Sequence, residues 1–120
     1  MKFLLVSLGG ALGALVRLLV SEVINNSSNI LFPFPTLLVN ILGCFAIGYL
    51  LSSMESKHWL FSEYFLMIGF LGAFTTFSAL SKETLLLVND GMPYWAILYV
   101  IFSVLGCLLA TWLGMSLSDR

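Results

Sequence analysis

The sequence has 120 residues, of which 60% are hydrophobic and only 9% are charged, and its mean hydropathy is +1.05. A water-soluble domain of this size needs a polar surface, and about 25% of the residues in such domains are charged. The composition therefore excludes a soluble globular domain and indicates an integral membrane protein. The net charge of −1 and the lack of a basic patch give no indication of nucleic-acid binding.

Four apolar segments follow one another, and each is long enough to cross a lipid bilayer as a helix. Two prolines precede the second segment, where they suit the start of a helix. The third segment exceeds the roughly 20 residues that a straight span needs. We expect an all-α membrane protein with a single domain of four transmembrane helices. The segments cover about residues 3–24, 36–54, 61–88 and 93–117.

The basic residues outside the spans favour one orientation in the membrane. Four spans place both termini and the second loop on one side, and this side carries Lys2, Lys57 and Arg120. The first and third loops carry no Lys or Arg. Because basic loops are retained in the cytoplasm, we expect a multi-pass protein of the cell membrane with both termini cytoplasmic. Arg17 and Lys82 weaken the bias, since both lie within spans toward the other side.

Residues 69–83 of the third segment are unusually polar for a stretch inside a bilayer. Gly72, Thr75 and Thr76 are weak helix formers there, and the segment is longer than a span requires. We therefore predict a break near the middle of this helix. Broken helices expose backbone carbonyls at membrane depth, and such carbonyls commonly hold a cation.

The same stretch contains aromatic and charged side chains with two readings each. Phe74 and Phe77 share a helix face. The ordinary interpretation is that both rings pack against lipid or the core, and the alternative is that the positive edge of a ring faces an anion. Glu83 lies beside Lys82 in the last turns of the span. Its carboxylate either reaches the membrane interface or lies at the mouth of a pore.

Polar side chains also occur within the second and fourth segments. Asn40 lies among apolar residues, as an interhelical hydrogen-bonding group or as a donor that faces a pore. In the fourth segment, four polar residues recur every four positions and so share one helix face. With Asn40 and Ser78 they would form a polar track through an apolar bundle. The four are Tyr99, Ser103, Cys107 and Thr111.

The remaining chemistry-bearing residues have ordinary explanations. Cys44 and Cys107 lie in mid-segment, so we interpret them as small packing residues rather than a disulfide or a metal site. His58 lies in a short polar loop. Neither a metal-ligand cluster nor a catalytic triad is visible in the sequence, so we expect no enzyme. Small residues spaced four apart in the first and fourth segments favour close helix packing. Four short helices bury little, which makes an oligomer a further expectation.

Three motifs lie in three of the four segments: GGALGALVR at residues 9–17, PTLLVNILGCFAIG at residues 35–48 and GFLGAFTTFS at residues 69–78. Together they resemble the motifs of the CrcB/Fluc family of fluoride channels, and the likeness covers nearly the whole chain. The resemblance implies passive export of toxic fluoride from the cytoplasm. It also implies an antiparallel dimer with two pores in the lipid bilayer and a structural sodium ion (Na+) at its centre.

The resemblance also implies roles for individual residues. Backbone carbonyls of Gly72 and Thr75 from both subunits would hold the sodium ion. Asn40 would donate to fluoride, and Phe77 would be the first phenylalanine of a pore-lining pair. Arg17 would have a structural role or lie in a vestibule. The rest of the fluoride pathway would comprise Ser78, Glu83, Tyr99, Ser103 and Thr111.

The sequence departs from the family pattern at three places. Pro35 replaces a usual glycine, and Cys107 stands where a serine is common. More important, Ala79-Leu80 replaces Thr-Phe, so the second pore phenylalanine is missing. In the family each pore takes its two phenylalanines from opposite subunits, and a homodimer of this chain would lack one in both pores. We therefore hypothesise a heterodimer with a homologous subunit of opposite orientation; a homodimer that tolerates leucine is the simpler alternative.

Two other functions fit four short spans. A proton-coupled exporter of the small multidrug-resistance type needs an acidic residue deep in its first span, but position 14 is alanine and Glu22 lies near the end. A non-conducting partner subunit would use the polar residues only for packing. In that case substitution of Asn40 or Phe77 would change packing but no ion flux.

Overall fold

The structure is a computed structural model that describes residues 1–27, 32–53 and 59–118. Throughout these ranges the regular structure is helical, without a strand, which confirms the expected all-α class. The first, second and fourth segments are single α-helices, and the third is divided into four parts. In chain order the elements are α1 (Lys2–Ser27), α2 (Phe34–Ser53), α3 (Trp59–Phe61), the π-helix η1 (Ser62–Leu71), α4 (Gly72–Phe74), α5 (Phe77–Asn89) and α6 (Pro93–Ser118).

The four predicted spans are present as four helices long and apolar enough to cross a membrane. Prolines mark two of the helix starts. Pro35 lies in the first turn of α2 and Pro93 is the first residue of α6, where a missing N–H removes no helical bond. The four candidate spans are Lys2–Asn25, Phe34–Ser53, Ser62–Asn89 and Pro93–Ser118.

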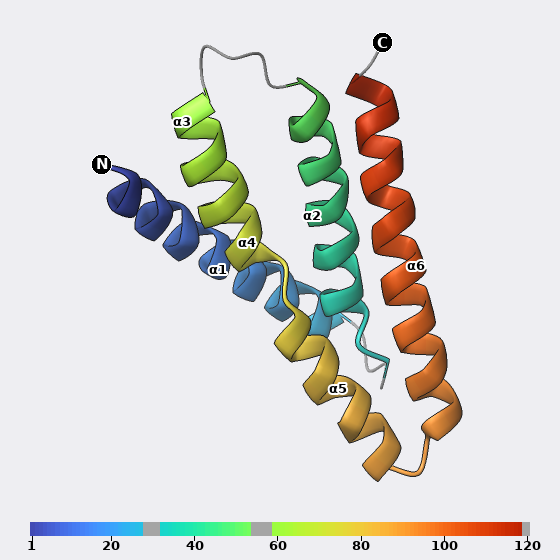
Figure 1. Ribbon diagram of the computed structural model, residues 1–120. Coiled ribbons are helices and arrows are strands. Elements are labelled where there is room, and N and C mark those ends of the chain that lie inside the picture. Colours follow the sequence, from blue (N-terminus) through green and yellow to red (C-terminus); the bar gives the residue numbers. More distant parts are fainter. Residues whose placement is uncertain (28–31, 54–58, 119–120) are drawn as a thin grey trace.

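Helices α2 and α6 lie side by side, and α1 crosses the bundle diagonally next to η1 and α4 (Figure 1). The start of α1 and the end of α6 lie toward the same end of the bundle, together with the end of α2 and the start of α3. The turn from α5 to α6 lies at the opposite end. Gly91 has a φ of 77° in this turn, a conformation that favours glycine.

Glycines bring two pairs of helix backbones into contact. A methyl group added at Gly13 of α1 would overlap the backbone carbonyl of Phe70 in η1. One added at Gly114 of α6 would overlap the backbone carbonyl of Phe45 in α2. These contacts confirm that the small residues serve close packing, as is usual in membranes.

The π-helix is the part of the fold that the sequence did not predict. It spans ten residues from Ser62 to Leu71, whereas most π-helical geometry occurs as single-turn bulges. Its Gly69 packs against α1, where an added methyl group would come within 2.9 Å of the Val6 carbonyl oxygen. The π-helix therefore lies along the closest contact between α1 and the third span.

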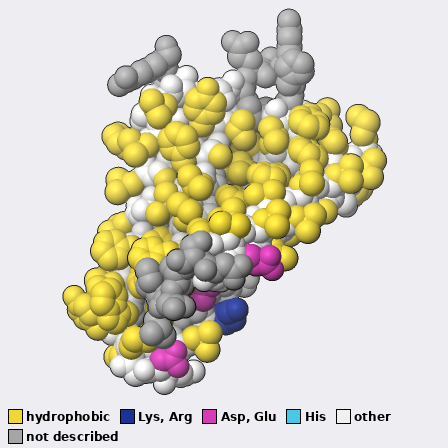
Figure 2. Space-filling model, turned by 180° about the vertical axis from the view of Figure 1, so that it is seen from behind, with side chains coloured by type: hydrophobic (Ala, Val, Ile, Leu, Met, Phe, Trp, Pro, Cys, Tyr) yellow, Lys and Arg dark blue, Asp and Glu magenta, His cyan; other side chains and the backbone are white. Residues whose placement is uncertain are grey.

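The core is small and most of the apolar surface faces outward. One cluster of buried side chains joins α5 and α6 through Leu80, Leu87 and Tyr99. A second cluster joins α2 to the third span through Val39 and Phe74. Hydrophobic side chains cover most of the face in Figure 2, and the few charged ones visible there gather in its lower part. Such a surface suits contact with lipid.

Candidate functional site

The third span is broken where the sequence predicted it. Helix α4 ends at Phe74 and α5 begins at Phe77. Between them Thr75 has φ −80° and ψ 154°, and Thr76 has φ −153° and ψ 123°, so both are extended. Two residues of extended backbone thus lie in the middle of a membrane span, where every polar group needs a partner.

Asn40 supplies partners for the backbone of this break. Its Nδ2 donates to the carbonyl oxygen of Thr76 at 3.0 Å, and its Oδ1 accepts from the Thr76 N–H at 2.7 Å. Asn40 is only 7% exposed. The side chain therefore joins α2 to the break, as the interhelical interpretation expected. A primary amide has two donor hydrogens, and the bond to Thr76 uses one of them.

The hydroxyl of Thr76 caps the start of α5. Its Oγ1 accepts from the N–H of Ala79 at 3.2 Å, which is the usual N-cap bond. It also lies 3.0 Å from the hydroxyl of Ser78. On the other side of the break, Thr75 N–H and Oγ1–H both donate to the carbonyl of Leu71, at 3.0 and 2.9 Å.

These bonds take away the regular partners of two carbonyls. In a continuous helix the Thr76 N–H would donate to Gly72, and the Ala79 N–H would donate to Thr75. Here the first donates to Asn40 and the second to the Thr76 hydroxyl. The carbonyl oxygens of Gly72 and Thr75 are consequently left without their helical donors, and Gly72 is exposed.

Phe77 and Ser78 point away from the bundle. Phe77 is 76% exposed and Ser78 is also exposed. Within one chain neither residue lines a passage, although both belong to the sequence motif. A pore that uses them needs a second subunit on this face.

Glu83 ties three helices together. Its Oε1 accepts from the Thr36 hydroxyl of α2 at 2.8 Å, and its Oε2 accepts from the Tyr99 hydroxyl of α6 at 2.6 Å. Tyr99 is completely buried, so its hydroxyl needs this hydrogen-bond partner. The carboxylate is thus directed into the bundle rather than out to the interface. Thr36 was not identified from the sequence; its position one helical turn before Asn40 was the only available signal.

The polar residues of α6 behave differently from one another. Tyr99 bonds to Glu83, whereas Thr111 donates to the carbonyl of Cys107 in its own helix at 3.0 Å. Ser103 is 2% exposed, and its hydroxyl has no hydrogen-bond partner among the residues that the structure describes. A buried hydroxyl without a partner is costly. Ser103 is therefore the member of this stripe most in need of a ligand.

Arg17 lies on α1 between Val16, which packs against the core, and Leu18, which is exposed. The valines at positions 16 and 20 contact the buried cluster of Val39, Leu71 and Phe74. The structural or vestibular role of Arg17 stays a prediction.

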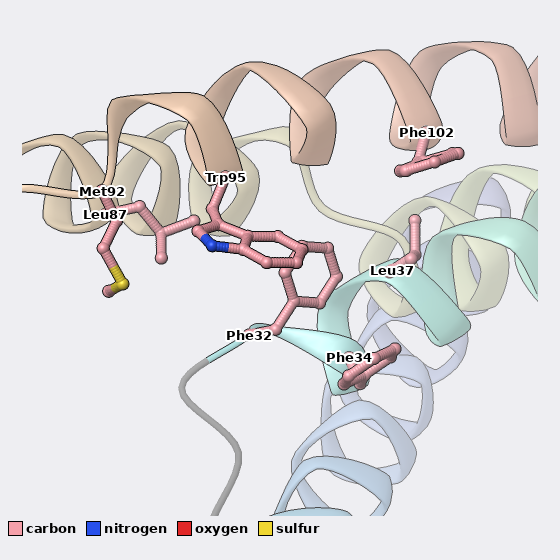
Figure 3. A pocket seen from close by; sticks show the side chains of 7 residues that line it. All are labelled: Phe32, Phe34, Leu37, Leu87, Met92, Trp95 and Phe102. Carbon is pink, nitrogen blue, oxygen red and sulfur yellow. The ribbon is translucent and has the colours of Figure 1, made fainter.

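A large hollow lies near the α5–α6 turn but lacks groups that could bind an ion. Its volume is about 650 Å³, and its lining side chains are apolar or aromatic (Figure 3). A smaller hollow of about 150 Å³ borders Glu83 and Asp90. Ion chemistry therefore belongs to the polar groups of α2, α5 and α6 rather than to the large cavity. That cavity is lined by Phe32, Phe34, Leu37, Leu87, Met92, Trp95 and Phe102.

Comparison with known proteins agrees with the motifs. The model of the family described as CrcB-like protein, Camphor Resistance (CrcB), matches residues 4–115. A protein of Campylobacter lari is 44% identical over 113 residues, covering 92% of each chain. A protein of Acidobacterium capsulatum is 42% identical over 122 residues, covering 100% of this chain and 98% of its own. Both relatives are named fluoride-specific ion channel FluC. This chain belongs to the CrcB family.

Proposed function

We propose that the chain is a subunit of a fluoride channel of the cell membrane, through which cytoplasmic fluoride leaves passively. Membership of the CrcB family carries this proposal, because the curated relatives are named fluoride-specific channels. The chemistry of the polar groups supports it. Fluoride is small and strongly hydrated, so a pore must replace its water with donors that also release it. Amide and hydroxyl groups do so without the permanent charge that would trap the ion.

The proposed pathway uses the polar groups along α2, α5 and α6. Ser103 offers a buried hydroxyl that lacks a partner in the described part of the chain. Asn40 retains a second amide hydrogen after bonding to Thr76. Tyr99 and Glu83 form a hydrogen-bonded pair nearer the α5–α6 turn. The full proposed set is Asn40, Phe77, Ser78, Glu83, Tyr99, Ser103 and Thr111.

A second subunit is needed to cover the face that carries the break. Gly72, Phe77 and Ser78 are exposed there, beside two residues of extended backbone. Lipid offers no hydrogen bonds to such a surface, so protein must cover it. We propose an antiparallel dimer in which each Phe77 reaches into a pore at the interface.

The sodium ion of the family fits the same break. Carbonyl oxygens suit a hard cation, and those of Gly72 and Thr75 have lost their helical donors. Four such oxygens, two from each subunit, would hold sodium at the dimer centre. The ion would supply positive potential beside the pathway without standing in it.

The Thr75→Pro variant tests this assignment. Proline removes the N–H that bonds to Leu71 at 3.0 Å and so disturbs the end of α4. We expect a loss of dimer, measured by light scattering in detergent, together with a loss of fluoride efflux. An intact, active Thr75→Pro protein would contradict the sodium site.

Leu80 bears on whether the dimer contains one kind of subunit. It is 6% exposed and packs in the cluster that contains Tyr99. The leucine thus lies beside the polar stripe at the position where the family has its second phenylalanine. We propose a heterodimer with a homologous subunit that supplies both phenylalanines, so that one pore is complete.

Fluoride-electrode recordings from liposomes test the function. The purified subunit is assayed alone and then together with a homologous subunit that carries both phenylalanines. Asn40→Ala and Phe77→Ile serve as loss-of-function variants. We expect efflux that both variants reduce and that the partner increases. Equal flux of chloride would contradict fluoride selectivity, and robust efflux from this subunit alone would contradict the need for a partner.

The proton-coupled exporter has no comparable support. Glu22 is exposed near the end of α1, whereas such an exporter needs a buried carboxylate deep in its first span. In the same liposomes, such an exporter would respond to a proton gradient, whereas the proposed channel conducts without one.

A further inference from the structure

The contact between α2 and α6 brings the two cysteines of the chain opposite each other. The two helices lie side by side and their backbones touch. A methyl group added at Gly106 of α6 would lie 3.2 Å from Cδ1 of Ile41 in α2. Further along, Gly48 of α2 meets the carbonyl of Thr111. These two contacts fix the register of the pair.

Cys44 and Cys107 fall between these contacts, one on each helix. On α2, position 44 lies three residues after Ile41 and four before Gly48, so all three share a face. On α6, position 107 lies directly after Gly106 and four residues before Thr111. Both thiols are free and half-buried. The register therefore places both cysteines at one level on the facing sides of α2 and α6.

We propose that Cys44 and Cys107 form a two-thiol site that binds mercury(II) and links α2 to α6. Thiolates prefer soft metal ions, and mercury(II) is satisfied by two sulfur ligands in a line. Neither helix needs a third ligand, and the described residues include no cluster of three or more His, Cys, Asp or Glu. Zinc, which takes four ligands, is not suited to such a pair.

Charge favours mercury(II) over other soft cations at this depth. Each thiol releases its proton to solvent as its S–Hg bond forms, so two protons leave and a divalent cation enters. The bound unit is neutral, which matters because a buried net charge is costly in a medium of low polarity. With a monovalent silver or copper ion, the bound unit would be neutral only if one of the two sulfurs kept its proton. That protonated sulfur would then be a weak ligand.

Mercury at this site would lie next to the proposed pathway. Cys107 stands between Ser103 and Thr111 on the polar stripe of α6, and the bound ion would fix the spacing of α2 and α6 there. We therefore expect mercuric chloride to inhibit fluoride efflux. This consequence rests on the proposed function, whereas the binding itself does not.

The binding test uses the full-length protein purified in detergent. It is loaded with three equivalents of mercuric chloride per subunit and then washed with excess N-acetylcysteine, a monothiol that removes singly bound mercury. We expect native mass spectrometry to show one mercury retained per subunit. We also expect both thiols to become unreactive toward maleimide and the melting temperature to rise, because a ligand of the folded state stabilises it.

The controls are Cys44→Ser and Cys107→Ser, with the alanine variants as replacements if serine disturbs folding. Each single variant is expected to lose its mercury to the monothiol and to show no rise in melting temperature. Retention of mercury by either single variant, or two mercury ions per wild-type subunit, would overturn the paired site. These readouts need no fluoride conduction, so a failure of the proposed function would not alter them.

Discussion

At the scale of single residues, the side chain of Asn40 makes the hydrogen bonds to Thr76 that a continuous helix would have made. The break leaves the N–H and the carbonyl of Thr76 without partners in their own span, and one amide side chain satisfies both. A residue that only accepts or only donates could not do so. The residue type follows from the local geometry of the backbone, whatever role the amide has toward an ion.

The variant Asn40→Leu tests this bond pair. Leucine is close in size but leaves two backbone groups of Thr76 unpaired, at a cost of about 1–3 kcal/mol for each buried group. We expect a lower midpoint of thermal unfolding in detergent. The exposed residue Asn89, at the end of α5, provides the control Asn89→Leu. Equal unfolding midpoints for the two variants would show that the Asn40 amide does not stabilise the fold.

Leu80→Phe tests the missing phenylalanine directly. If the leucine impairs the pore, the aromatic side chain should raise fluoride efflux from liposomes that contain this subunit alone. Leu85→Phe is the matched control, because Leu85 lies on the outer surface of the same helix. No gain from Leu80→Phe, with the variant folded and dimeric, would favour the homodimer that tolerates leucine.

At the scale of elements, close backbone contact holds the spans together. The contacts of α1 with η1 and of α2 with α6 depend on glycines that leave no room for a side chain. In lipid there is little hydrophobic driving force between helices, so dispersion contacts at short range matter more than in water.

Two neighbouring glycines of α1 give a matched test. An added methyl group at Gly13 would overlap the carbonyl of Phe70, whereas one at Gly10 would lie 3.9 Å from the carbonyl oxygen of Gly69, an ordinary contact. We expect Gly13→Ala to destabilise the protein by about 1–3 kcal/mol, the usual range for overpacking, and Gly10→Ala to be near neutral. Unfolding in a denaturing detergent titration measures both.

The spans and the break could be predicted from the sequence, whereas the π-helix and the bond of Thr36 to Glu83 could not. Apolar length predicts four spans, and Gly72, Thr75 and Thr76 predict the break, because the signals are local. The π-helix is not predictable in this way, since a segment apolar on all sides has no period that separates π from α. The bond of Thr36 to Glu83 joins residues 47 apart. It depends on how α2 and α5 are rotated, which the sequence does not state.

At the scale of the whole molecule, the break marks the face on which we propose that a second subunit packs. The chain buries little of its own apolar surface, and lipid can cover the rest, but not extended backbone. The proposed dimer would therefore depend on the polar groups at the break more than on hydrophobic area. Its stability should depend on whatever cation satisfies the carbonyls of Gly72 and Thr75.

Replacement of sodium tests this dependence. In buffers where N-methylglucamine replaces sodium, we expect the dimer to dissociate at higher subunit concentration, because the central carbonyls lose their ligand. Size-exclusion chromatography at several dilutions measures the change. Addition of sodium should restore the dimer, and dissociation that is identical in both buffers would contradict a structural cation.

The break has an electrostatic consequence that no single residue reveals. The break divides the third span into a piece formed by η1 and α4 and a piece formed by α5. The negative end of the first dipole therefore meets the positive end of the second. Oriented peptide groups thus supply partial charges of both signs within a few residues of Thr75 and Thr76. The centre of the membrane can attract a cation and an anion at neighbouring places without an ionisable side chain at the break.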